Sequence, residues 1–180
     1  MLRITVPAVE QWDEQKQEFV YSKEQTLQLE HSLVSLSKWE SKWNKAFLSK
    51  NEKTREETLD YIKCMTITQN VDPSVYERLS AYNIKQVNDY IEAPMTATYI
   101  NEGKDSKGAK EVVTAELIYY WMIALNIPFE CQKWHLNRLL TLVKVCNIKN
   151  SPPKKRSKRD IMSQNAAINA ARRKKLNSKG

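Results

Sequence analysis

Residues 114–148, TAELIYYWMIALNIPFECQKWHLNRLLTLVKVCNI, form the most apolar part of the chain. Thr114 can accept a hydrogen bond from a free backbone amide, so a helix is predicted over 115–125. That helix is apolar or aromatic on almost every face, which indicates burial. Asn126-Ile127-Pro128 interrupts it, and a second apolar helix is expected from Pro128 to about Ile148. The two segments predict an αα-hairpin at the centre of the fold.

Four further helix starts precede this hairpin, each with residues that can satisfy the free amides of a first helical turn. Ser37 to Glu40 and Thr54 to Glu57 both have the spacing of a capping box. Asp72-Pro73 places a capping side chain before a proline, which predicts a short helix through Leu79. Asn83 begins another helix. This part of the chain is therefore expected to be mostly α.

Tryptophans are frequent for a chain of this length and could stack on nucleobases or fill a core. Trp39, Trp43, Ala46 and Phe47 recur at helical spacing, which predicts one apolar stripe on the first helix. Trp134 lies among apolar residues of the central hairpin. We therefore expect these side chains to be core residues, with Trp134 as an anchor of the hairpin.

The first 36 residues carry short segments with the alternation typical of strands. Residues 2–6 alternate apolar and polar side chains and stop at Pro7, and 17–21 and 26–30 are further candidates. A small hairpin or three-stranded sheet is expected here. Later in the chain, 96–100 and 111–113 could form two more strands around a polar loop.

The distribution of charge divides the chain into two parts. The whole chain has 29 basic and 21 acidic residues, a net charge of +8, but ten of the basic residues and only one acid follow residue 150. We therefore predict a nearly neutral, mainly helical globular domain over 1–150 and a basic linker with a marginal helix over 151–180. The predicted fold class is mainly α (α+β): a helical bundle around the central αα-hairpin, with a small N-terminal β-hairpin or sheet and a basic C-terminal tail.

The basic tail supplies the candidate partner-binding residues. Runs of this kind bind nucleic acid, anionic surfaces or acidic partners, or simply remain solvated. The candidates flank or belong to a helix predicted over 161–176, and they are Lys154, Lys155, Arg156, Lys158, Arg159, Arg172, Arg173, Lys174 and Lys175. No base-reading motif accompanies them, so nucleic acid contact through the tail is expected to be non-specific.

Several classes of protein are disfavoured by composition and motifs. Only three glycines are present, and neither GxGxxG nor GxxxxGK[ST] occurs, so no phosphate-binding loop is expected. Three cysteines without a CxxC motif predict reduced thiols in a cytosolic protein rather than a disulfide framework. The N-terminal residues lack the apolar stretch of a signal peptide, and no run of 18 apolar residues predicts a membrane span.

The candidate catalytic and metal-binding residues are few. Cys131 and His135 are four residues apart on a predicted helix and could share a metal ion, but no second pair of ligands stands nearby. Cys64, Cys131 and Cys146 all lie in apolar helical stretches, where thiols are usually inert. Glu56 suits the first turn of a helix. The chain is therefore predicted to be a non-enzyme that uses no metal or cofactor.

Several stretches, taken together, resemble a known family. They are Ser35-Leu36-Ser37-Lys38-Trp39-Glu40-Ser41-Lys42-Trp43 with Phe47-Leu48, then Asp60-Tyr61-Ile62-Lys63-Cys64-Met65, residues 124–140, and the basic tail with Asn169-Ala170-Ala171-Arg172-Arg173. The chain resembles the tail assembly chaperones of siphophages, which are encoded between the tail tube and tape measure proteins.

The resemblance implies a non-catalytic protein that holds the long, mostly helical and aggregation-prone tape measure protein and recruits tail tube subunits. It also implies action in the host bacterial cytoplasm and absence from the mature virion. Two alternatives stay open. One is a phage nucleic-acid-binding or head and packaging accessory protein that acts through the basic tail, and the other is a structural subunit of the tail or head–tail junction.

Overall fold

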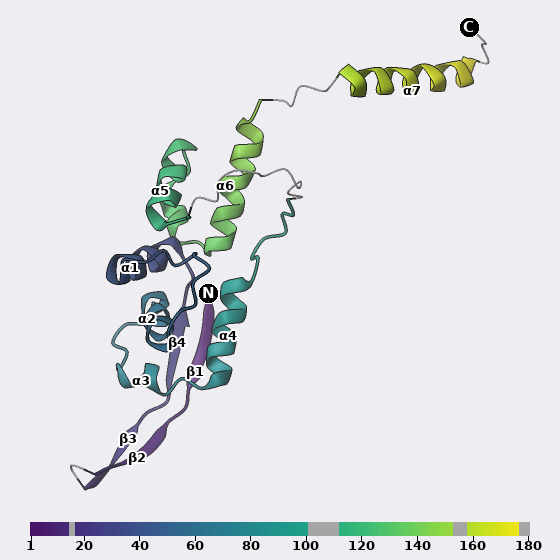
Figure 1. The fold of residues 1–180 in the computed structure, drawn as a ribbon. Coiled ribbons are helices and arrows are strands. Elements are labelled where there is room, and N and C mark those ends of the chain that lie inside the picture. Colours follow the sequence, from purple (N-terminus) through teal and green to yellow (C-terminus); the bar gives the residue numbers. More distant parts are fainter. Residues whose placement is uncertain (15–16, 101–111, 153–157, 177–180) are drawn as a thin grey trace. The chain divides into compact units, whose positions relative to one another are not determined.

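The computed structural model describes residues 1–14, 17–100, 112–152 and 158–176. Contacts divide the chain into two compact units, Met1–Asn147 and Ile148–Gly180. Along the chain the elements are β1 (Leu2–Val6), β2 (Val9–Asp13), β3 (Glu18–Ser22), β4 (Gln25–Leu29), α1 (Leu33–Trp43), α2 (Arg55–Met65), α3 (Ser74–Glu77), α4 (Ala81–Glu92), α5 (Ala115–Ala124), the 3-10 helix η1 (Phe129–Lys133), α6 (Leu136–Asn150) and α7 (Lys158–Leu176). This confirms the predicted fold class, mainly α with a small N-terminal β element (Figure 1).

The N-terminal β element is one long hairpin whose ladder is interrupted once. β1 pairs with β4 and β2 pairs with β3, both antiparallel. The register does not change across the interruption, because Val6 faces Gln25 and, three positions further, Val9 faces Ser22. Pro7 lies in the gap and has no amide hydrogen to donate, which explains the break. Of the four strands, only β2 was not predicted.

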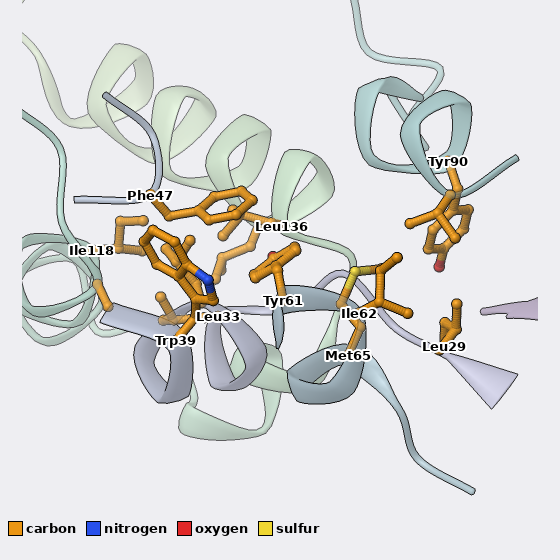
Figure 2. Packing of buried hydrophobic residues seen from close by; sticks show 14 of the residues in the cluster. Leu29, Leu33, Trp39, Phe47, Tyr61, Ile62, Met65, Tyr90, Ile118 and Leu136 are labelled. Atoms are coloured by element: carbon orange, nitrogen blue, oxygen red, sulfur yellow. The ribbon is translucent and has the colours of Figure 1, made fainter. Parts of the chain in front are cut away.

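The core forms where helices cover one face of the β1–β4 pair. Ile4 and Leu27 are fully buried on that face. α4 packs against β1, and α1 packs against α2, α5 and η1. An aromatic group lies at the centre, where the ring centroids of Phe47 and Tyr61 are 3.8 Å apart and those of Phe47 and Trp39 are 5.1 Å apart (Figure 2). The central apolar segments of the sequence also reach this core through Ile118, Met122, Leu136, Leu139 and Val143.

Two of the predicted helix starts are confirmed at the residue. Thr54 and Glu57 form the reciprocal hydrogen bonds of a capping box at α2, and Thr114 caps α5. The start at Ser37 was wrong, because α1 begins after Ser32, which forms its capping box with Ser35. Glu40 does not cap α1. Its carboxylate instead accepts hydrogen bonds from two backbone amides outside the helix.

The remaining starts are displaced by one to three residues. α4 begins after Ser80, which is its N-cap residue. Asn83 is the third residue of the helix and forms the capping box with Ser80. α3 begins at Ser74, one residue after Pro73, while the Asp72 carboxylate accepts from the Ser74 amide.

α1 ends at Trp43, and Asn44 after it has the left-handed conformation with φ of 52°, so Phe47 returns to the core from a loop. The single stripe predicted from Trp39 to Phe47 was therefore wrong.

The second helix of the predicted central hairpin is broken into two pieces. η1 ends at Lys133, the backbone of Trp134 after it is extended, and α6 starts at Leu136. The break follows from a long-range contact, because the Leu136 amide donates to the His31 carbonyl at 2.7 Å. Trp134 is only half-buried, with the Arg138 guanidinium 4.2 Å from its ring, so its prediction as a core anchor was wrong. Trp39 is the fully buried tryptophan.

The predicted later strands are not formed where the structure describes them. Residues 96–100 and 112–113 have no regular structure, and residue 111 lies outside the described residues. In the second unit, α7 confirms the helix predicted over 161–176 and begins three residues earlier. Met162 and Leu176 on this helix are largely exposed. None of the helices in the described ranges is long and apolar enough to cross a membrane.

Candidate protein-binding surfaces

The cysteines have the properties of packed thiols. Cys131 is buried, and Cys64 and Cys146 are half-buried. Burial raises the pKa of the Cys64 and Cys131 thiols, so both are protonated at neutral pH. Because the thiolate is the nucleophilic form, these two side chains are poor nucleophiles.

The proposed Cys131–His135 metal pair does not share a helical face. The break at Trp134 separates the two residues, and both ring nitrogens of His135 have partners. Nε2 lies 2.9 Å from the Tyr90 carbonyl, to which it donates, and Nδ1 accepts from the Asn137 amide at 3.3 Å. Within the described residues, no group of three or more His, Cys, Asp or Glu side chains could hold a metal ion.

A buried pair of histidines was not anticipated from sequence. The rings of His31 and His135 have centroids 5.1 Å apart, and Nδ1 of His31 lies 2.6 Å from the Tyr61 hydroxyl. Burial, together with the smaller effect of the neighbouring His135, lowers the pKa of His31 to about 3. Burial also lowers the pKa of His135. Both imidazoles are therefore neutral in the folded chain at pH 7.

The histidine pair predicts a loss of stability in mild acid. Between pH 6.5 and 3 the unfolded chain binds a proton at His31 that the folded chain does not, so stability falls as the pH falls. His31 alone should lower the free energy of unfolding by about 2 kcal/mol between pH 7.5 and 5. Urea unfolding of the intact chain and of His31→Asn across this range measures the effect. The slope of the free energy of unfolding against pH should be smaller in the variant, by the amount that corresponds to about one bound proton. Equal slopes would contradict the prediction.

An apolar groove of about 620 Å³ lies on the first unit. It will be called the apolar groove. Its walls come from the 48–51 loop, residues 112 and 113, α5 and α6, and its lining residues are Leu48, Ser49, Lys50, Asn51, Val112, Val113, Trp121, Leu140, Val143, Lys144 and Asn147. Apolar side chains form most of this lining, and two lysines belong to it.

Glu40 positions two walls of the apolar groove. One oxygen of its buried carboxylate accepts from the Phe47 amide at 2.8 Å, and the other accepts from the Ala115 amide at 2.7 Å. The first bond fixes the start of the 48–51 loop, and the second fixes the first turn of α5. The Lys45–Glu57 ion pair of 2.6 Å ties the same loop to α2. The walls of the groove are therefore held by contacts that do not involve its lining side chains.

The β2–β3 hairpin is a second surface of the first unit and will be called the arm (Figure 1). Trp12, Phe19 and Tyr21 are 52%, 65% and 65% exposed. The Trp12 and Phe19 rings lie edge to face across the two strands, with centroids 4.9 Å apart. Sequence reasoning found β3 but missed β2. The available signal was weak, because only Trp12 and Asp13 mirror Phe19 and Glu18 about the polar residues 14–17.

The basic candidate residues are placed only in part. Arg159, Arg172, Arg173, Lys174 and Lys175 lie on α7 and are exposed, and Lys158 is its first residue. The last four occupy the final turns, where cations interact favourably with the helix dipole. Lys154, Lys155 and Arg156 lie outside the described residues. α7 therefore gathers one cationic cluster at its C-terminal end.

No protein-family model, curated protein or solved structure matches this chain. The chemistry of the apolar groove, the arm and α7 is accordingly the basis for the functional argument that follows.

Proposed function

We propose that this chain is a non-catalytic tail assembly chaperone that holds the tape measure protein as an amphipathic helix in the apolar groove. The observation that supports the proposal is the groove itself, an open apolar concavity with walls fixed by Glu40. Grooves of this kind bind the apolar face of a helix through residues spaced three or four apart. The resemblance of the sequence to the siphophage chaperones supplies the identity of the partner.

The charges around the groove fit such a ligand. Lys50 belongs to the lining, and the apolar floor includes Trp121 and Leu140. A helix with one apolar face and acidic flanks would satisfy both features. The bound helix would be kept from aggregating while tail tube subunits are recruited. This activity belongs in the host bacterial cytoplasm, and the chain would be absent from the mature virion.

Nucleic acid binding through α7 is the second candidate function. It is favoured by the exposed cluster Arg172, Arg173, Lys174 and Lys175. Binding through phosphate contacts alone would depend steeply on salt and would not discriminate between sequences. A protein with this function would use the tail for affinity and the folded body for positioning.

Substitutions on the exposed rim of the groove test the first function without disturbing the core. Leu48 and Val112 are 38% and 57% exposed, so Leu48→Asp with Val112→Asp should leave the fold intact. The double variant should bind labelled tape measure fragments at least tenfold more weakly, since a bound helix would desolvate a carboxylate among the apolar lining residues. Ile123→Asp is the matched control, because Ile123 is exposed on α5 but does not line the groove.

Binding of duplex DNA by the same proteins separates the two functions. The variant with Arg172→Glu, Arg173→Glu, Lys174→Glu and Lys175→Glu should lose DNA binding and keep most of its affinity for tape measure fragments. Tight DNA binding at physiological salt without capture of tape measure fragments would favour the second function. Equal affinity of the groove variant and the intact chain for these fragments would remove the groove from the proposal.

A further inference from the structure

The arm exposes the continuation of the face that is buried in the rest of the hairpin. Side chains alternate between the two faces of a ribbon, and the register is unchanged across the break at Pro7. Ile4 of β1 and its partner Leu27 therefore share a face with Trp12 of β2 and its partner Phe19. The first pair is 2% and 0% exposed beneath the helices, whereas the second pair is 52% and 65% exposed.

A two-stranded ribbon with one bare aromatic face is an incomplete structure. Isolated two-stranded hairpins are marginally stable in water and gain stability when a further element covers their apolar face. Tyr21 extends the aromatic pair along the same face, since it lies two residues from Phe19 and opposite Glu10. The face formed by Trp12, Phe19 and Tyr21 will be called the aromatic face. Such a contiguous apolar patch is typical of an interaction site.

The charge of the arm indicates which partner can cover this face. Five acids and two lysines lie between residues 8 and 24, a net charge of about −3: Glu10, Asp13, Glu14, Glu18, Glu24, Lys16 and Lys23. Two arms placed face to face would repel each other. A partner with cations beside apolar side chains would instead be attracted. Arginine and lysine also bind favourably over aromatic rings.

α7 of the same chain has this complementary chemistry. Ile168, Arg172 and Lys175 recur at i, i+4 and i+7, so they lie on one face of the helix, and Leu176 adjoins them. Ile168 and Leu176 are 42% and 74% exposed, and the two basic side chains are also exposed. Residues 168–176 span about 13 Å of helix, which is comparable with the length of about 17 Å of a five-residue strand.

We infer that the aromatic face of one copy binds α7 of a second copy. Ile168 and Leu176 pack on Trp12 and Phe19, and Arg172 and Lys175 contact the aromatic rings and the acids beside them. Each copy offers one arm and one α7, so each contact joins two different surfaces. This association goes beyond the proposed chaperone function and does not depend on it, because it needs no tape measure protein.

Sedimentation velocity of the full chain, from about 1 to 200 µM, tests the inference in the absence of any partner. The mean mass should rise with concentration at 50 mM salt and rise much less at 500 mM salt. Phe19→Ser with Tyr21→Ser, and separately Arg172→Glu with Lys175→Glu, should each weaken association at least tenfold. Tyr82→Ser is the matched control, since Tyr82 is an aromatic residue of α4 that is 69% exposed. Circular dichroism shows whether each variant keeps its helices.

A charge exchange identifies the two surfaces as partners. Glu10 and Glu14 flank Trp12 in sequence, and Glu10→Lys with Glu14→Lys should abolish association of that variant with itself. Mixing it with the Arg172→Glu, Lys175→Glu variant should restore association between the two variants. A chain that stays monomeric over the whole range would overturn the inference. So would association that neither the arm variant nor the α7 variant weakens, or the absence of rescue on mixing.

Discussion

Replacing Trp39 with alanine is expected to lower the free energy of unfolding by about 3–5 kcal/mol. Trp39 is 1% exposed and its ring contacts Phe47 and Tyr61, so the substitution leaves a cavity at the centre of the core. It also removes the hydrogen bond of 2.9 Å from Nε1 to the Glu57 carbonyl. Equilibrium unfolding in urea, with helix content as the readout, measures the loss.

Trp12→Ala is the matched control for this prediction. The chemical change is the same, but the Trp12 side chain is half exposed and its ring lies against that of Phe19. At a protein concentration low enough to keep the chain monomeric, this variant should lose about 1 kcal/mol or less. Losses of similar size in the two variants would show that Trp39 is not the anchor of the core.

Replacing Glu40 with alanine is expected to lower the free energy of unfolding by about 2–5 kcal/mol. The buried carboxylate is the acceptor for the Phe47 and Ala115 amides, and both amides would lose their partner in the variant. The 48–51 loop and the first turn of α5 would lose their common anchor. Amide hydrogen exchange at Phe47 and Ala115 should become faster, in addition to the shift in the unfolding midpoint.

Two variants define how this prediction can fail. Glu40→Gln keeps one acceptor oxygen and should lose roughly half as much stability as Glu40→Ala. Glu56→Ala removes an exposed carboxylate from the first turn of α2 and should change stability by about 1 kcal/mol or less. If Glu40→Ala were as stable as Glu56→Ala, the hydrogen bonds from the Phe47 and Ala115 amides to Glu40 would not be what holds the groove walls.

Local signals in the sequence predicted most of the elements and some of their ends. The capping box at Thr54 and the cap at Thr114 were found because each depends on side chains within four residues. The break before Leu136 could not be found in this way. It depends on the carbonyl of His31, which is more than a hundred residues away in sequence. A periodic apolar pattern over 128–148 gives no sign of such a contact.

The candidate surfaces were less accessible to sequence reasoning than the fold. The cationic cluster of α7 was visible as a run of basic residues. The apolar groove was not, because its walls come from four separate segments that only the tertiary structure brings together. Glu40 was misassigned for a related reason. Its spacing from Ser37 fits a capping box, but the buried amides of Phe47 and Ala115 compete for its carboxylate.

The contact between the His31 carbonyl and the Leu136 amide also affects the order in which the chain can fold during synthesis. Leu33 and Leu36 are buried in a core that includes Leu136, Leu139 and Val143, so the early half of the chain is made before its packing partners exist. At 5–20 residues per second, roughly 5–20 s pass on the ribosome between Leu33 and Val143. Throughout that interval the nascent α1 and α2 segments have an uncovered apolar surface, and the cooperative closure of the core waits for α6.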